Sequence, residues 1–331
     1  MPSPSSPVSA NMLRVHGALL VVQILFALWP VAGAALLEVM TPRALIFVRL
    51  TAGAPILAIA TLAIRRSAAA GRATWAERVR VGIALAGLAA LGISINQLLF
   101  AEGLKRAGPI NASIMVMLIP PLTVAIAAAL GRERPSAGRL GGVAISLVGA
   151  ALLVGAERFD LGAEHTLGNL LLLGNTTAYA FYLVLARPIL GRLGALVTMA
   201  FVLGFGALEA LPITLRAALE TDWSALRPLH WALLGFVVAG PTLLTYLLNG
   251  YALARAESTL VAVYVYVQPP IAAAATFFAF GTKPTTRTVI AALVIFAGVA
   301  LSTGLAVQVA RWIRRPAREG RASREAREKD V

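Results

Sequence analysis

Long apolar runs separated by short polar segments recur along the whole chain. We count ten of them, at about residues 13–37, 44–64, 81–103, 109–130, 140–155, 167–186, 193–215, 229–253, 259–280 and 289–309. A bilayer core about 30 Å thick requires roughly 20 apolar residues in a helix, so these lengths predict an all-α membrane protein with ten transmembrane helices. The fifth run is short and rich in glycine, which is typical of a helix packed closely among neighbours.

The chain also contains an internal repeat. Residues 96–155 align without a gap with residues 245–304, at a constant offset of 149 positions. The matching positions include two Pro-Pro pairs inside apolar runs, Pro120-Pro121 and Pro269-Pro270. Chance matches of Leu and Ala are common in apolar sequences, whereas shared prolines and glycines at constant spacing are not. The alignment therefore predicts two copies of one helical unit.

Each predicted copy holds five spans, and this odd number fixes how the copies relate. The second copy must cross the bilayer with the opposite polarity, so we expect two inverted five-helix repeats, at residues 13–156 and 167–310. A linker at 157–166 joins them. Residues 1–12 are rich in Pro and Ser and are expected to form a disordered cap, and 311–331 form a basic tail.

Composition narrows the chemistry that such a bundle can perform. The chain is 59% apolar and only 13% charged, whereas roughly a quarter of the residues in soluble domains are charged. It has no cysteine, which excludes disulfides and thiolate metal sites, and its three histidines are spread along the chain, so we expect no metal site and no cofactor. Neither Gly-Lys-Ser nor Gly-Lys-Thr occurs, which argues against ATP-driven activity by this chain alone.

The formal net charge of +14 would suggest a nucleic-acid partner in a soluble protein. Here the basic residues lie mainly in the short segments between spans. With the N-terminus inside, the inner segments hold 20 Lys and Arg and the outer segments hold 8, and 8 of the inner ones belong to the tail. The positive-inside rule then predicts that both termini are cytoplasmic. We expect an integral protein of a bacterial inner membrane. Its partner is then the lipid bilayer, and we expect no nucleic-acid partner.

Several short segments give the chain a family resemblance. The first repeat carries Leu104 and Ala107, then the mid-span prolines, then Gly131-Arg132-Glu133 and a glycine-rich helix from Gly141. With the span count and the repeat, this pattern resembles the drug/metabolite transporter superfamily, and within it the EamA type, over residues 19–305. The resemblance implies a ten-helix carrier that exports or exchanges amino acids, metabolites or drugs through a central cavity.

Two single residues bear on this resemblance. Arg49, early in the second span, is similar to an arginine that the family often carries there. Glu133 corresponds to Thr282 at the repeat offset, so the Gly-x-Glu-like loop is intact in one copy only.

Polar and aromatic side chains inside spans cost free energy unless they face a partner or a wet cavity, so they are candidate substrate-binding residues. Two groups share a helical face: Asn175, Tyr179 and Tyr182 in the sixth span, and Thr242, Tyr246 and Asn249 in the eighth. The candidates are Gln23, Trp29, Asn96, Gln97, Asn111, Asn175, Tyr179, Tyr182, Tyr246, Asn249, Tyr264 and Gln268. The alternative for each is a hydrogen bond between neighbouring helices or an anchor at the bilayer interface.

Two carboxylates inside spans, Glu102 and Glu209, are candidates for proton coupling, because a buried carboxylate can bind and release a proton. For Glu102 the alternative is a salt bridge with Lys105 or Arg106, one turn away. The Pro-Pro pairs lie near the middle of their spans, where a missing N–H kinks a helix and produces either a hinge or a packing bend. The hinge candidates are Pro120, Pro121, Pro269 and Pro270.

These observations predict a secondary transporter that exports or exchanges a small metabolite, amino acid or drug by alternating access between the repeats. A lipid-handling flippase or a channel could have the same fold, and both remain alternatives. An intramembrane enzyme would need an acid–base or metal cluster, and no such cluster is evident in the spans, so we do not expect an enzyme. The substrate, the direction, the coupling ion and the oligomeric state, including a homodimer, stay open.

Overall fold

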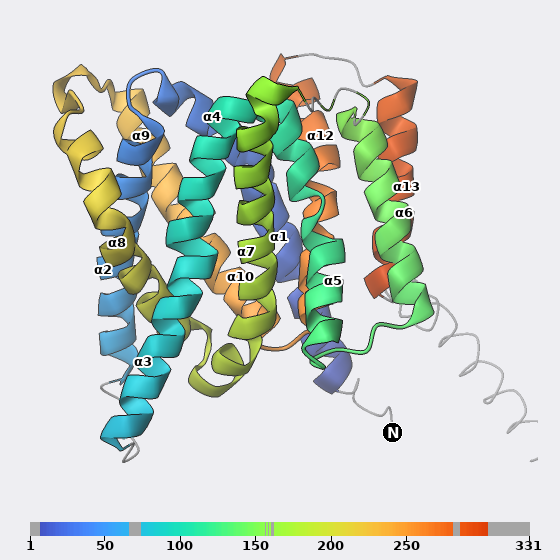
Figure 1. The fold of residues 1–331 in the computed structure, drawn as a ribbon, viewed down its shortest axis with the longest axis horizontal. Helices are drawn as coiled ribbons and strands as arrows, with labels where there is room; N and C mark the ends of the chain where they lie inside the picture. Colours follow the sequence, from blue (N-terminus) through green and yellow to red (C-terminus); the bar gives the residue numbers. More distant parts are fainter. Residues whose placement is uncertain are drawn as a thin grey trace, which may run out of the picture.

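The computed structural model describes residues 7–65, 74–155, 157, 159, 162–280 and 285–303. Its α-helices within these ranges form one bundle (Figure 1). They are α1 (Pro7–Leu37), α2 (Pro42–Arg65), α3 (Trp75–Ala89), α4 (Ile95–Val116), α5 (Ile119–Ala129), α6 (Ala137–Val154), α7 (Ala163–Leu193), α8 (Ala195–Leu219), α9 (Pro228–Val237), α10 (Thr245–Leu253), α11 (Ser258–Val263), α12 (Gln268–Phe280) and α13 (Thr286–Thr303).

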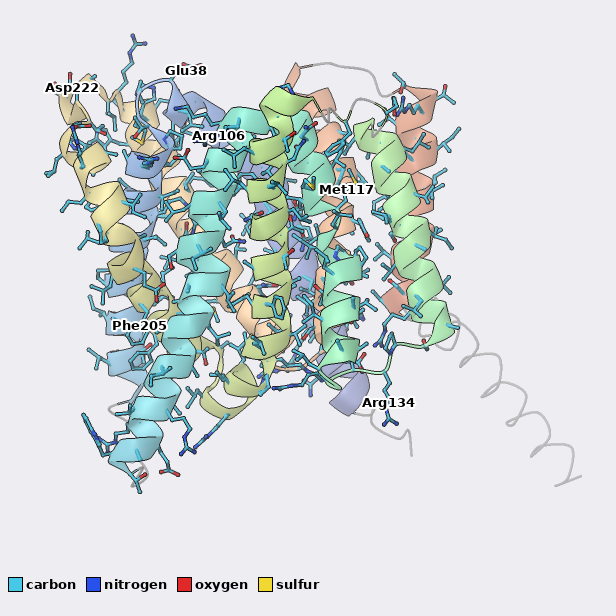
Figure 2. All side chains as sticks on the ribbon, in the orientation of Figure 1. Glu38, Arg106, Met117, Arg134, Phe205 and Asp222 are labelled. Carbon is cyan, nitrogen blue, oxygen red and sulfur yellow. The ribbon has the colours of Figure 1, made fainter. Side chains whose placement is uncertain are left out.

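The predicted ten-helix membrane architecture is confirmed. In the described ranges, ten helical stretches are long and apolar enough to cross a bilayer, and some of them combine consecutive helices, as α9 and α10 do over Pro228–Leu253. The chain runs up and down through the bundle, and α1 begins on the side toward which α13 runs (Figure 1). Figure 2 labels Arg134 at one end of the bundle and Arg106 at the other, and we call these the Arg134 end and the Arg106 end.

Two spans contain a short π-helical turn at matching places. One turn covers Ala90–Ser94, between α3 and α4, and the other covers Val238–Leu244, between α9 and α10. Shifted by the repeat offset of 149 residues, the first turn falls inside the second. Because π-turns are rare and concentrate at functional sites, this shared position indicates a common feature of the two halves.

The proline pairs are not inside continuous helices, which corrects the expected mid-helix kinks. α4 ends at Val116, and Pro120 and Pro121 lie in the first turn of α5. Pro269 and Pro270 lie in the first turn of α12, after a 3₁₀ turn at Tyr264–Val267. A first-turn N–H has no partner within its helix, so proline is tolerated there without the loss of a hydrogen bond. Their proposed role as hinges stays a prediction.

The helices α6 and α13 pack very closely against each other. A Cβ atom added at Gly142 would lie 2.4 Å from the Ser302 nitrogen, and one added at Gly298 would lie 2.5 Å from the Ser146 nitrogen. Small residues are therefore required for the two backbones to approach this closely, as is common between membrane helices. α4 packs along α7 in a similar way, and α2 packs along α8.

Some expected boundaries differ from the structure. α1 begins at Pro7, so residues 7–12 are helical where a disordered cap was expected. α7 begins at Ala163, so the end of the expected linker belongs to its first turn. Thr282 and the basic tail lie outside the described residues.

Candidate functional site

The most unusual residue of the bundle is Arg49, a buried cation in α2. Only 8% of its surface is exposed. Its Nε donates to Thr242 Oγ1 at 3.0 Å, its Nη1 donates to Gln97 Oε1 at 3.4 Å, and its guanidinium lies 4.6 Å from the centre of the Trp29 ring. Four helical segments of the two halves therefore meet at one cation, because these partners come from α1, α4 and the π-turn before α10.

Hydrogen bonds continue from Arg49 across the bundle. Gln97 Nε2 donates to the phenol oxygen of Tyr246 in α10 at 3.4 Å. One turn further, Asn249 Nδ2 donates to the phenol oxygen of Tyr179 in α7 at 3.2 Å. We call the group Trp29, Arg49, Gln97, Tyr246, Tyr179 and Asn249 the polar layer. Trp29, Gln97, Tyr179 and Tyr246 are each partly exposed.

A second set of polar contacts joins α1 to the broken span of α11 and α12. Gln268 Nε2 donates to Gln23 Oε1 at 2.7 Å, and His16 Nδ1 lies 2.6 Å from the phenol oxygen of Tyr264. His16 and Tyr264 are both buried. The structure thus brings the predicted residues Gln23, Tyr264 and Gln268 to one interface, with His16 as a partner that the sequence had not suggested.

Other predicted residues are engaged in helix packing. Asn96 Nδ2 donates to the Asn175 carbonyl at 3.1 Å, and Asn175 Nδ2 donates to the Asn96 carbonyl at 2.8 Å, so the two side chains fasten α4 to α7 reciprocally. Asn111 Nδ2 donates to Asn169 Oδ1 at 2.9 Å, also between α4 and α7. Tyr182 is 2% exposed and its ring stacks on Tyr179 at 5.7 Å. For Asn96, Asn111 and Asn175 the geometry therefore favours the packing alternative.

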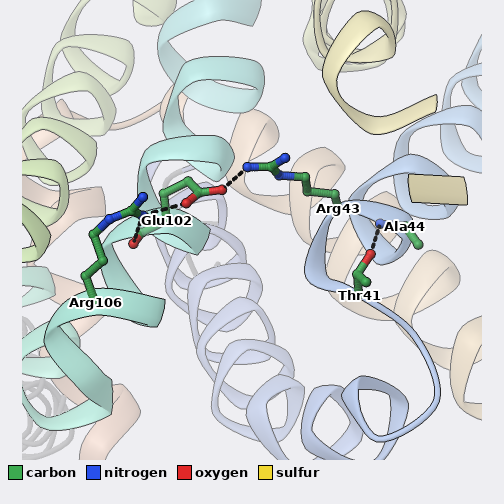
Figure 3. Close-up of polar contacts among 5 residues, drawn as sticks. All are labelled: Thr41, Arg43, Ala44, Glu102 and Arg106. Atoms are coloured by element: carbon green, nitrogen blue, oxygen red, sulfur yellow. Dashed lines mark hydrogen bonds and ion pairs between the residues drawn. The ribbon is translucent and has the colours of Figure 1, made fainter. Parts of the chain in front are cut away.

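The two candidate carboxylates have different surroundings. Glu102 pairs with Arg43 of α2 and with Arg106 of its own helix α4 (Figure 3), so the salt bridge with Arg106 exists and Arg43 is an additional partner. Its side chain is 28% exposed. Glu209 of α8 accepts a hydrogen bond from the Ser94 hydroxyl, inside the first π-turn. Protonation would cost Glu102 both ion pairs, and proton coupling through Glu102 or Glu209 stays a prediction.

A third carboxylate, Glu133, is buried at the Arg134 end. Its Oε1 accepts from the backbone N–H of Ser258 at 2.5 Å, its Oε2 accepts from the N–H of Thr259 at 3.2 Å, and Arg187 lies 3.7 Å away. Its side chain is only 1% exposed. These contacts join the segment after α5 to the first turn of α11 and to α7. A cavity of about 240 Å³ lies beside them, lined by residues that include Arg132, Arg187 and Ala254.

Sequence reasoning left Arg49, Thr242 and Glu133 out of the candidate site. For Arg49 the signal was present, because a basic residue within a span is a site candidate by default. Glu133 was noted only as part of the family resemblance, and its role could not be found locally because its backbone partners lie 125 and 126 residues along the chain.

Three hydrogen bonds link positions that the repeat makes equivalent. Gln97 bonds to Tyr246, Tyr266 donates to the Met117 carbonyl at 3.0 Å, and Ser146 donates to the Ile295 carbonyl at 3.4 Å. Each pair is separated by 149 residues. The two halves therefore touch at corresponding positions in three different parts of the described bundle.

A model of the EamA-like transporter family matches the chain twice, at residues 14–155 and 166–304. The chain belongs to the EamA-like transporter family. The two matches cover almost the whole bundle, so both halves of the polar layer lie within family units.

Named relatives extend the comparison. An "Uncharacterized transporter" of Archaeoglobus fulgidus is 28% identical over 65% of this chain and 75% of its own length. A WAT1-related protein of Arabidopsis thaliana is 29% identical over 65% of this chain and 62% of its own length. A "Probable terminal-alkyne amino-acid exporter" of Streptantibioticus cattleyicolor is 26% identical over 76% of this chain and 81% of its own length. A solved crystal structure matches 91% of this chain and 99% of its own with a TM-score of 0.72 at 23% identity, which shows the same fold.

Proposed function

We propose that this member of the family is a secondary carrier, which exports small organic solutes by alternating access between its two halves. The observation that carries the proposal is the polar layer. Helices of both halves contribute hydrogen-bonding and aromatic side chains to it within the membrane-spanning part of the bundle, around one buried cation. Polar groups at that depth are expensive and are kept where a polar solute has to pass.

The contacts between equivalent positions support the alternating mechanism. In an assembly with two-fold symmetry, a residue contacts its own equivalent only on the symmetry axis. The pairs Gln97–Tyr246, Met117–Tyr266 and Ser146–Ile295 satisfy this condition. With five spans in each half, such an axis would lie in the membrane plane. Inverted repeats related in this way can exchange conformations, so that one site opens first to one side and then to the other.

The relatives support export of small organic solutes. The transporter names of the relatives from Archaeoglobus and Streptantibioticus favour a carrier over an enzyme, and the latter name includes amino-acid export. The excess of basic residues in the segments of the Arg134 end supports a cytoplasmic position for this end under the positive-inside rule. The bundle would then lie with both described termini toward the cytoplasm, in keeping with an exporter of a bacterial inner membrane.

The test begins with an untargeted comparison of metabolites inside and outside cells with and without the protein. Solutes depleted inside and enriched outside are then measured by counterflow in proteoliposomes that contain the purified protein. A carrier gives saturable exchange that is faster with the same solute inside. Leak that does not saturate would point to a channel, and scrambling of labelled lipid without solute exchange would point to a flippase.

A matched pair of variants tests the role of the polar layer. Tyr246→Phe removes the oxygen that accepts from Gln97, whereas Tyr251→Phe makes the same change on the same helix at a ring that stacks with Arg255. The loss of one hydrogen bond corresponds to about 1 kcal/mol. We expect Tyr246→Phe to reduce counterflow about 5-fold. We expect Tyr251→Phe to retain the wild-type rate, and equal rates for the two variants would remove the polar layer from the transport path.

A further inference from the structure

We propose that Arg49 is the anchor for a carboxylate group of the transported solute, so that the substrate class is monoanionic or zwitterionic organic acids. This inference rests on the proposed function, because it assigns one chemical role within the same polar layer.

Arg49 carries a positive charge inside the helical bundle. Among the described residues, no carboxylate lies within ion-pair distance of its guanidinium, and the side chains that it contacts, Thr242, Gln97 and Trp29, are all neutral. Only 8% of the surface of Arg49 is exposed, so the cation is buried without a counter-charge. Buried charges in membrane proteins are normally paired with one another, because an isolated charge is expensive at that depth. An unpaired buried cation therefore indicates a site whose counter-charge arrives with a ligand.

The carboxylates inside the neighbouring helices are already engaged elsewhere. Glu102 is held by Arg43 and Arg106, and Glu209 accepts from Ser94. Moving Glu102 toward Arg49 would cost it both ion pairs. Within the described ranges, these helices thus provide no ready counter-ion for Arg49.

The donor geometry suits a carboxylate. A guanidinium has five N–H donors in a planar fork that can bind both oxygens of one carboxylate. In the described structure, Arg49 donates hydrogen bonds from Nε and from Nη1, and the Nη1 bond is long at 3.4 Å. Thr242 and Trp29 hold the side chain in place, which reduces the entropy lost when a ligand binds.

The single charge limits the class of anion. One unpaired cation balances one negative charge, whereas a phosphate monoester would bring about two. The Trp29 ring beside the guanidinium adds an apolar wall, and Tyr246 adds an aromatic ring with a hydroxyl on the far side of Gln97. The site therefore fits a carboxylate that bears an aromatic or aliphatic group.

Two measurements on the wild-type protein test this assignment. The first is the chemical class of the solutes that cells export through it. The second is inhibition of their counterflow by 3-phenylpropionate, L-phenylalanine and L-leucine, each compared with its primary amide. We expect the exported solutes to carry a carboxylate, and we expect at least one of the acids to inhibit about 100-fold more strongly than its amide, as two lost charge-assisted hydrogen bonds imply.

Variants of Arg49 then test whether this residue causes the preference for acids over amides. Arg49→Gln should lower the apparent affinity for the exported acids about 100-fold, and Arg49→Lys, which keeps the charge but not the fork, about 10-fold. The control is Arg216→Gln, an arginine whose side chain is 87% exposed, and it should retain the wild-type affinity. If Arg49→Gln does not fold, the comparison of acids with amides on the wild-type protein still decides.

The outcomes separate this inference from the proposed function. Saturable export of solutes that lack a carboxylate, or equal inhibition by every acid and its amide, would overturn the role of Arg49 and leave the carrier standing. Unchanged affinity in a folded Arg49→Gln variant would do the same. Absence of saturable transport of any solute would overturn the carrier, and the carboxylate subsite with it.

Discussion

The two ends of the bundle are both fastened by charged side chains, but they differ in burial. At the Arg134 end, the Glu133 side chain is 1% exposed and accepts hydrogen bonds from two backbone N–H groups of α11. At the Arg106 end, the Glu102 side chain is 28% exposed, and its partners Arg43 and Arg106 are 49% and 41% exposed (Figure 3). One end therefore depends on a desolvated carboxylate and the other on a hydrated ion network.

This difference indicates which end opens more easily. Water replaces the partners of an exposed ion pair at small cost, so such pairs contribute about 0–1 kcal/mol. A buried carboxylate that loses its partners costs about 3–5 kcal/mol, because its charge stays in a poor solvent. In a carrier that alternates between two open states, we therefore expect the Arg106 end to open at lower cost than the Arg134 end.

The largest expected effect comes from Glu133→Gln. The amide keeps one acceptor oxygen but places an NH₂ group against the N–H of Ser258 or Thr259, and it removes the ion pair with Arg187. We expect a loss of about 2–4 kcal/mol in the free energy of unfolding, measured by denaturant titration in mixed micelles. The exposed Glu220→Gln, which breaks only the surface pair with Arg216, is the control and should change the stability by less than about 0.5 kcal/mol.

The absence of native cysteine allows the same variant to be tested for opening. A single Ala254→Cys substitution places a thiol in the cavity beside Glu133 and Arg187. A hydrophilic maleimide should label this thiol several-fold faster when Glu133→Gln is added than in its absence. Equal labelling rates and equal stabilities would mean that Glu133 does not fasten the Arg134 end.

The sequence alone predicts the membrane architecture well, for a physical reason. Bilayer thickness imposes a span length, and the apolar composition of each span is a local property, so the ten spans can be found without knowledge of their contacts. The proline pairs show the limit of this reasoning. The missing N–H of Pro120 was predicted to kink a continuous helix, whereas the structure ends α4 earlier and begins α5 beside the proline.

The site could be predicted only in part, because local patterns identify polar faces but not their partners. The helical face of Tyr246 and Asn249 was predicted, yet their partners Gln97 and Tyr179 depend on how α4 and α7 pack against α10. Glu133 lies in a loop that bears on the family resemblance, but the sequence does not show that its carboxylate is buried against Ser258. Burial and long-range pairing are properties of the packed chain, and the hydrophobic pattern does not encode them locally.

A smaller effect is expected from the second charged contact at the Arg134 end. Arg139 of α6 pairs with Glu257, just before α11, and the two side chains are 22% and 39% exposed. The pair is therefore more exposed than Glu133 and somewhat less exposed than the Glu102–Arg43 pair. We expect Arg139→Gln to cost about 1 kcal/mol, and a double-mutant cycle with Glu257→Gln to give a coupling energy of similar size. Additive single effects would show that the contact contributes nothing to the Arg134 end.

The smallest effect is expected from Glu102→Gln at the Arg106 end. Its ion pairs are hydrated, so the loss should be below about 1 kcal/mol and should shrink further as the salt concentration rises, because salt screens exposed charges. Efflux by this variant should respond to an imposed pH gradient in the same way as wild-type efflux, since protonation of Glu102 would break two ion pairs. Glu209→Gln, measured in parallel, removes the carboxylate that accepts from Ser94. If Glu102→Gln alone abolished the response to the gradient, Glu102 would be the coupling residue. Its ion pairs would then do more than hold the Arg106 end together.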